Sequence, residues 1–282
     1  EIVSLFGRGG HQVAYTSIKS AKWSQQLGDE EILAIGGGDG SVGKVIKELL
    51  NRRLADSSYC LAILPLGTAN NVAKTLGFCS GVESAIDSLR SARYERVDVG
   101  KVLGIPGHEF FLESAGLGLI AELMLKVDKL KKENKAAFNT PEKKMNVALD
   151  QLREVVLAME SFSCEITADG EIFSGKYLLA EVANMGTVGP NLCLANDATP
   201  FDGLLNIVLL PEDERHAFAS FVQGISEGNS GQYPFKSIFA KAITIKCDKT
   251  IAHVDDELLD GKGIEKLSAK VLRGPLQFLL PR

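Results

Sequence analysis

Hydrophobic positions in the first third of the chain alternate between two spacings. Unbroken apolar runs at residues 32–35 and 59–64 predict two short buried strands. After each run, apolar side chains recur at i, i+3, i+4 and i+7, the spacing of one helix face. The predicted helices cover residues 42–54, 70–76 and 82–89. Alternation of strand and helix indicates an α/β domain with a parallel sheet.

The pattern changes after residue 96. Short strand-like runs predominate, and Asp169-Gly170 between two of them predicts a tight hairpin turn. Helical patterns at 120–132 and 145–159 interrupt these runs. We therefore predict an N-terminal α/β domain (residues 1–96) and a larger, mainly antiparallel β-sandwich domain (residues 97–282). The last strand can return to the first domain, and the active site is expected in the cleft between them. The predicted strands cover residues 97–102, 109–114, 162–168, 171–182, 204–210, 242–246 and 251–254.

A glycine-rich turn joins the first predicted strand to the first helix. Such a turn lets main-chain N–H groups approach a phosphate, and the helix N-terminus adds a positive dipole. The carboxylate of Asp39 within the turn would repel phosphates unless Mg²⁺ bridged them. The alternative is a structural turn that binds no ligand. We predict that a phosphorylated ligand binds at Gly36, Gly37, Gly38, Asp39, Gly40 and Ser41.

Two common phosphate-binding motifs match this turn incompletely. Residues 38–43 fit the dinucleotide fingerprint G-x-G-x-x-G, but the next strand ends in Pro65 instead of an acidic residue. Residues 38–44 fit most of a P-loop, but Val45 stands where Ser or Thr would bind magnesium. The turn is therefore assigned to neither class.

A second polar loop follows the next predicted strand. In a parallel sheet, ligands bind beyond the carboxyl ends of neighbouring strands, so both loops are expected to face one ligand. Helix capping by Thr68, Asn70 or Asn71 is the alternative explanation of its polar residues. The residues predicted to bind the ligand from this loop are Gly67, Thr68, Asn70 and Asn71.

Composition excludes several classes of protein. The 282 residues carry a net charge of −5, which argues against a general nucleic-acid binder. The five cysteines lack C-x-x-C spacing, so a disulfide framework or a zinc ribbon is not expected, and a cytoplasmic location fits best. No apolar run approaches 18 residues, so no membrane span is expected. A lysine-rich segment between Lys129 and Lys144 is expected to form a solvated helix face and mobile loop, or alternatively a patch that touches anionic lipid.

Several motifs, in order along the chain, resemble those of the diacylglycerol kinase catalytic family, which includes bacterial lipid kinases and sphingosine kinases. Gly37 to Ser41 is similar to the family's G-G-D-G-T, and Pro65 to Asn71 to its P-x-G-T-x-N-D. Further similar segments lie at residues 116–122, 195–208, 254–259 and 274–281. The resemblance covers nearly the whole chain from residue 32.

The resemblance implies an ATP- and Mg²⁺-dependent kinase that phosphorylates a lipid hydroxyl at the membrane surface, as a peripheral protein. It places the general base at Asp255, with Asp260 as the alternative, and Glu257 beside it to orient the metal or the hydroxyl. It also implies Asp39 and Asp202 as metal ligands. An exposed acidic turn without catalytic function is the structural alternative for residues 255–260.

The chain departs from the family pattern at several positions. Ser41 replaces Thr, Asn71 replaces Asp, and Asp256 replaces the Gly that would leave the turn after Asp255 freer. Other departures lie at Gly43, Lys44, Thr199 and Phe201. They keep open a catalytically inactive nucleotide- or lipid-binding regulator, and the first glycine loop also fits an NAD kinase-like enzyme. The sequence identifies neither the lipid nor an oligomeric state, although a homo-oligomer is possible.

Overall fold

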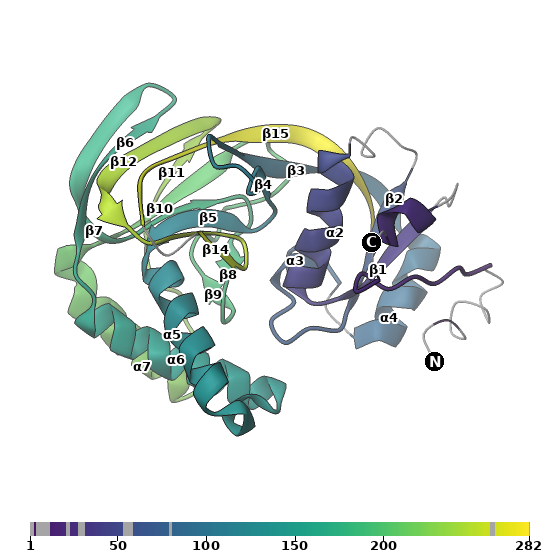
Figure 1. Ribbon diagram of the computed structural model, residues 1–282, viewed down its shortest axis with the longest axis horizontal. Coiled ribbons are helices and arrows are strands. Elements are labelled where there is room, and N and C mark those ends of the chain that lie inside the picture. The colour runs from purple at the N-terminus through teal and green to yellow at the C-terminus, as the bar shows by residue number, and fades with distance from the viewer. Residues whose placement is uncertain are drawn as a thin grey trace. The chain divides into compact units, whose positions relative to one another are not determined.

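The computed structural model describes residue 3 and residues 12–20, 23–27, 32–52, 59–78, 81–259 and 263–281 (Figure 1). Contacts divide the chain into two compact units, residues 1–98 with 273–282 and residues 99–272. Strands β3 (Arg93–Leu103) and β15 (Ile264–Leu280) each continue from one unit into the other.

The first unit has the predicted α/β organisation. Strand β1 pairs in parallel with β2, from Ile32↔Cys60 to Gly37↔Pro65, and the end of β15 pairs in parallel with β2. One face of α2 is buried, which explains its helical apolar spacing. Residues 53 and 54 of the predicted helix lie outside the described residues. The elements are η1 (Trp23–Gln26), β1 (Ile32–Gly37), α2 (Asp39–Asn51), β2 (Cys60–Pro65), α3 (Asn71–Thr75), α4 (Gly81–Ser88) and η3 (Leu89–Ser91).

The second unit is a mainly antiparallel β domain, as predicted. Its strand order is β15-β12-β6-β7-β5-β13-β14, and β10 pairs with both β7 and β11. Beside β3 and β15, its strands are β4 (Phe110–Phe111), β5 (Ser114–Gly118), β6 (Phe162–Ala168), β7 (Glu171–Ala183), β8 (Thr187–Val188), β9 (Leu192–Cys193), β10 (Leu205–Pro211), β11 (Lys236–Ala240), β12 (Ala242–Thr250), β13 (Ala252–Val254) and β14 (Glu257–Leu258).

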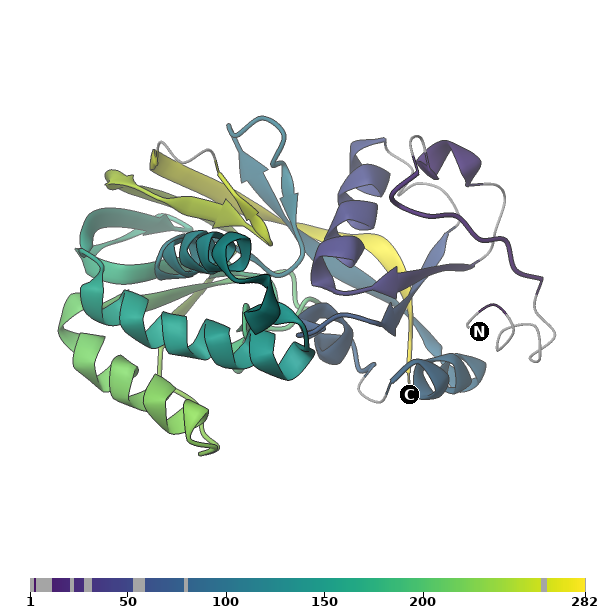
Figure 2. The same ribbon diagram turned by 60° about the horizontal axis from the view of Figure 1, so that its bottom comes forward.

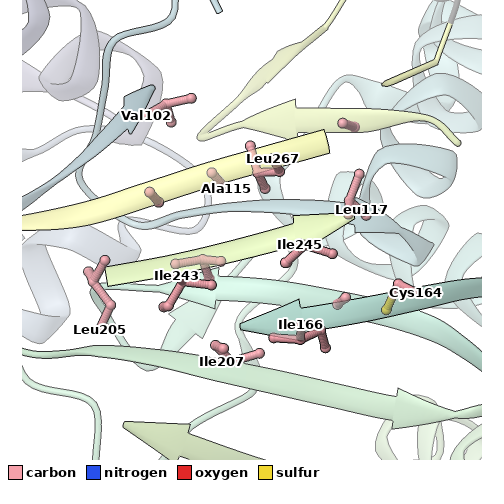
Figure 3. Packing of buried hydrophobic residues seen from close by; sticks show 14 of the residues in the cluster. Val102, Ala115, Leu117, Cys164, Ile166, Leu205, Ile207, Ile243, Ile245 and Leu267 are labelled. Atoms are coloured by element: carbon pink, nitrogen blue, oxygen red, sulfur yellow. The ribbon is translucent and has the colours of Figure 1, made fainter. Parts of the chain in front are cut away.

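Alternate residues of these strands enter two different cores, because successive side chains point to opposite faces of a sheet. In β10, Leu205, Ile207 and Leu209 join a core built almost entirely from strand residues, which we call the strand core. Figure 3 shows part of it. Val208 and Leu210 join a second core, formed with the helices of this unit. The unit therefore buries both faces of β7 and β10.

Three helices cover one face of these strands. Helices α5 (Leu119–Glu133), α6 (Pro141–Ala158) and α7 (Arg215–Ser226) lie side by side, as Figure 1 and Figure 2 show. The predicted loop before α6 is shorter than expected, because most of this segment forms η4 (Lys135–Phe138) and the first turn of α6. Thr140 caps α6 by accepting the Lys143 N–H at 3.3 Å. Helix α7, which follows η5 (Glu212–Glu214), was not predicted from the sequence.

The predicted hairpin turn at Asp169-Gly170 is confirmed. It joins β6 to β7, with Ala168 opposite Glu171 and positive φ angles of 47° and 97° at the two turn residues. A two-residue turn with both φ values positive matches the twist of the paired strands. The Asp169 carboxylate also accepts the N–H groups of Lys241 and Ala242, at 2.9 and 2.8 Å. Asp169 therefore ties this turn to the start of β12.

Candidate functional site

The two glycine loops of the first unit touch each other backbone to backbone. A Cβ on Gly38 would lie 2.8 Å from the Gly67 Cα, and a Cβ on Gly67 would lie 2.3 Å from the Gly38 Cα. The Leu66 N–H also donates to the Gly37 carbonyl at 3.0 Å. None of these three glycines has a positive φ. Glycine is therefore required at positions 38 and 67 because the two backbones approach closely.

Asp39 joins the two loops with its side chain. It is the first residue of α2, and its Oδ1 accepts the N–H of Val72, in α3, at 2.9 Å. Gly37 packs against the first turn of the same helix, and a Cβ at this position would lie 2.4 Å from the Ser41 Cβ. The structure thus brings the two predicted loops into contact at the N-terminus of a 13-residue helix. This arrangement presents a carboxylate and a positive helix end in one place.

Asn70 closes the second loop and does not cap α3. It has a left-handed φ of 53°, its Oδ1 accepts the Gly67 N–H at 2.8 Å, and its Nδ2 donates to the Gly67 carbonyl at 3.0 Å. Thr68 is partly buried within the same loop, whereas Asn71 is 2 % exposed. Asn70 therefore fixes the shape of the loop, and the capping interpretation is wrong for this residue.

Asp255 is held in a turn of the second unit by hydrogen bonds to one neighbouring segment. Its Oδ1 accepts the N–H groups of Leu112, Glu113 and Ser114, at 3.0, 2.9 and 3.3 Å. Its own N–H donates to the Ser114 carbonyl at 2.8 Å. Oδ2 also accepts the Leu112 N–H, at 3.2 Å.

These bonds correct two expectations. The strand predicted over residues 109–114 is confirmed only in part, because it is interrupted between β4 and β5, where the N–H groups of residues 112–114 donate to Asp255. The expected constraint from Asp256 is wrong. The positive φ, 50°, belongs to Asp255, and Asp256 has none. Replacing the family's Gly with Asp at this position therefore causes no left-handed strain.

The remaining predicted residues lie in different surroundings. Glu257 faces His108, with 3.1 Å between Oε2 and Nδ1. Asp202 accepts the Leu204 N–H within its own turn, at 2.9 Å. Among the described residues, no group of three or more His, Cys, Asp or Glu side chains is placed to hold a metal. Asp260 lies outside the described residues. The roles of Glu257, Asp202 and Asp260 remain predictions.

A buried ion pair behind Asp255 was not predicted. The His253 Nε2 lies 3.0 Å from Glu181 Oε1 and 3.2 Å from Oε2, and both side chains are almost fully buried. Burial by itself lowers the pKa of His253, but the charge of Glu181 and hydrogen bonds to Glu181 and the Asp255 carbonyl outweigh it, so the pKa is raised. Glu181 interrupts the apolar run of residues 177–183, and that single charge was the available sequence signal.

The comparisons with known proteins identify the family. The sequence model of the diacylglycerol kinase catalytic domain matches residues 10–102. The model of the "YegS C-terminal NAD kinase beta sandwich-like domain" matches residues 125–274, more than half of the chain. The chain belongs to the diacylglycerol kinase catalytic-domain family, in agreement with the resemblance in its motifs.

Individual relatives are more distant. The chain is 27% identical to the diacylglycerol kinase of Bacillus subtilis (strain 168) over 191 residues, covering 65% of this chain and 56% of that protein. The chain thus spans little more than half the length of this relative. The crystal structure of a diacylglycerol kinase from Bacillus anthracis str. Sterne matches with a TM-score of 0.64 and 21% identity, over 89% of this chain and 78% of that one. This second similarity concerns the fold.

Proposed function

We propose that the protein is an ATP-dependent lipid kinase that transfers the γ-phosphate of ATP to a lipid hydroxyl, diacylglycerol-like or related. The observation that carries the proposal is the contact between the two glycine loops, joined by the Asp39–Val72 hydrogen bond, in a member of a kinase family. Phosphoryl transfer depends mainly on positioning and on neutralising phosphate charge. Two backbones fixed against each other at a helix N-terminus suit that task.

Asp39 fits the nucleotide-bound magnesium of such a kinase. Mg²⁺ in kinase sites is held by one or two carboxylates together with phosphate oxygens and water. Asp39 supplies one carboxylate at the phosphate-binding loops, and its hydrogen bond to Val72 engages one lone pair of Oδ1. When bound, Mg²⁺ would neutralise charge on the phosphate oxygens. Gly38, Gly40 and Gly67 would let main-chain groups approach the phosphates.

Asp255 is proposed as the general base for the lipid hydroxyl. A hydroxyl is a poor nucleophile at neutral pH, and a positioned carboxylate accepts its proton as the new bond forms. Three backbone N–H groups hold Oδ1, and the Leu112 N–H also reaches Oδ2, so the carboxylate is fixed within its turn. Glu257, next to His108, would orient the hydroxyl or the metal.

A phosphorylation assay with radiolabelled ATP tests this function. Lipid vesicles containing diacylglycerol, a total lipid extract, and NAD would be offered as acceptors. Label in a lipid product supports the proposal, label in NADP supports the NAD kinase-like alternative, and no transfer to any acceptor supports the inactive regulator. Asp260→Asn in the same assay tests the alternative base.

Asp39→Asn is the variant that tests the nucleotide site. It retains an oxygen to accept the Val72 N–H but removes the negative charge that would bind Mg²⁺. We expect turnover to fall by about 10²-fold or more with an unchanged unfolding midpoint. Turnover equal to that of the wild type would contradict the role of Asp39.

We further propose a cytoplasmic protein that associates peripherally with membranes. No helix among the described residues is long and apolar enough to cross a bilayer. The lysines at 129, 131, 132, 135, 143 and 144 are exposed on α5, η4 and α6. Each lysine near an anionic surface contributes about 1 kcal/mol to binding.

Sedimentation with vesicles tests the membrane proposal. Binding to anionic vesicles should weaken in high salt and in the triple variant Lys131→Gln, Lys132→Gln, Lys135→Gln. The matched control replaces Lys249, Lys266 and Lys270, which are exposed on β12 and β15. Binding that depends on neither lipid charge nor salt, or equal loss in both variants, would contradict it.

A further inference from the structure

A row of three residues crosses the second unit behind the Asp255 turn. Glu181 on β7 and His253 on β13 both lie opposite Gly116 of the intervening strand β5. Directly opposed residues lie on the same face of a sheet. A Cβ on Gly116 would lie 1.8 Å from Glu181 Oε2, so the Glu181 side chain crosses β5 through the space that glycine leaves. The missing side chain of Gly116 is what lets Glu181 reach His253.

Strand periodicity places this row on the helix-covered face. The side chains of the neighbouring residues Ala115, Leu117, Ala180 and Val182 point into the strand core. Gly116 and the side chain of Glu181 therefore lie on the opposite face. Helix α5 packs against β5, β7 and β13 on that side. Glu181 is 0% exposed and His253 is 1% exposed. An apolar pair of similar volume often stabilises a fold at least as well as a buried ion pair, so stability alone does not account for these residues.

His253 connects this row to the backbone of Asp255. Its Nδ1 lies 2.8 Å from the Asp255 carbonyl oxygen. A carbonyl oxygen can only accept a hydrogen bond, so Nδ1 must donate. Nε2 faces the Glu181 carboxylate at the same time, which favours a doubly protonated imidazole. Asp255 is thus held from two sides, its carboxylate by residues 112–114 and its carbonyl by His253.

We propose that Glu181 and His253 are positioning residues for Asp255, and that they act by fixing the backbone of its left-handed turn so that its carboxylate keeps the orientation needed to accept the proton of the lipid hydroxyl. This inference rests on the proposed function for its effect on catalysis. The contact that acts on Asp255 is the Nδ1–carbonyl hydrogen bond, while Glu181 orients and charges the imidazole. A displacement of about 1 Å at a reacting group can cost 10²-fold in rate.

Two neutral double variants separate the positioning contact from the rest of the pair. In both, Glu181→Gln removes the buried charge, so that no carboxylate is left without a partner. With His253→Asn, the amide nitrogen takes about the place of Nδ1 and keeps a donor toward the Asp255 carbonyl. With His253→Gln, the amide nitrogen takes about the place of Nε2 and that donor is lost.

The proposal predicts a difference in kcat between the two double variants. The variant with His253→Gln should have a kcat about 10- to 100-fold lower than the variant with His253→Asn. Their KM values for ATP and lipid should be equal, and their thermal midpoints similar. Equal kcat in both, or a loss of kcat that follows the loss of thermal stability, would overturn the proposal.

A measurement without turnover keeps this test separate from the proposed function. Nitrogen-15 NMR of the wild-type protein reports the protonation of each ring nitrogen of His253, and amide exchange reports protection of the Asp255 turn. A protonated Nδ1, with faster exchange at Asp255 in the His253→Gln double variant only, supports the positioning contact even if no lipid is phosphorylated. An unprotonated Nδ1, or the same exchange in both variants, would overturn it.

Discussion

Two hairpin turns of the second unit, at Asp169-Gly170 and Asp255-Asp256, share one local construction. Each begins with an aspartate at positive φ, 47° and 50°, and each carboxylate accepts N–H groups from a separate segment of backbone. Their surroundings differ. Asp169 is exposed, and a Cβ on Gly170 would meet no described atom within 4 Å. Asp255 is backed by the buried pair of Glu181 and His253.

This comparison shows which feature separates a structural turn from a candidate catalytic one. Asparagine and aspartate tolerate left-handed φ and bond to nearby N–H groups, so an aspartate-led turn needs no function to explain it. A buried ion pair costs free energy to desolvate, and the Asp169 turn has the same aspartate-led construction with its aspartate exposed. The charge placed behind Asp255 therefore distinguishes the two sites better than their backbones do.

The largest difference in stability should appear between a substitution at Gly116, opposite His253, and one at Gly170, within the Asp169 turn. Gly116→Ala would place a methyl group against Glu181 and displace its carboxylate from His253, so we expect unfolding to become easier by about 3–5 kcal/mol. Gly170→Ala meets open space and adds only left-handed strain at a φ of 97°, about 1–2 kcal/mol. Urea unfolding of both variants measures the difference. Equal losses would contradict the packing of Glu181 across Gly116.

The pH dependence of stability should have opposite signs at the two turns. The raised pKa of His253 gives stability that is complete below about pH 6.5 and is lost as pH rises through the folded value. Backbone N–H groups of Lys241 and Ala242 lower the pKa of Asp169, so its contribution is complete above about pH 3.8 and is lost as pH falls.

Unfolding free energies measured from pH 3 to pH 9 test these signs. The double variant Glu181→Gln, His253→Asn should lose the decline on the alkaline side, and Asp169→Asn should weaken the decline on the acid side. An alkaline decline that is unchanged in the double variant would show that another group causes it.

Local patterns predicted the parts of the fold that depend on local chemistry. Apolar runs and helical spacing located β1, β2 and α2, and the Asp169-Gly170 signal located a hairpin. The strand predicted over residues 109–114 is interrupted because the N–H groups of residues 112–114 bond to Asp255, more than 140 positions away. The reason for glycine at positions 38 and 67 was likewise a contact between separate loops, which no single-loop pattern contains.

The site residues show the same difference between what local patterns predict and what contacts between distant segments decide. Motif resemblance placed Asp39 and Asp255, and the structure gives both carboxylates partners that fix their positions. Glu181 and His253 lie far apart in sequence, and only the pairing of β7, β5 and β13 brings them together. Their partnership could not be predicted without the strand register.

The most direct test of the account compares turnover of Asp255→Asn and Asp169→Asn in the lipid kinase assay. Each substitution keeps the side-chain size, tolerance of left-handed φ and an acceptor oxygen, but removes the ability to take a proton. We expect Asp255→Asn to lower kcat by about 10²–10⁴-fold with unchanged ATP affinity, and Asp169→Asn to leave kcat unchanged. Wild-type kcat in Asp255→Asn, or an equal fall in both variants, would contradict the assignment of Asp255 as the general base.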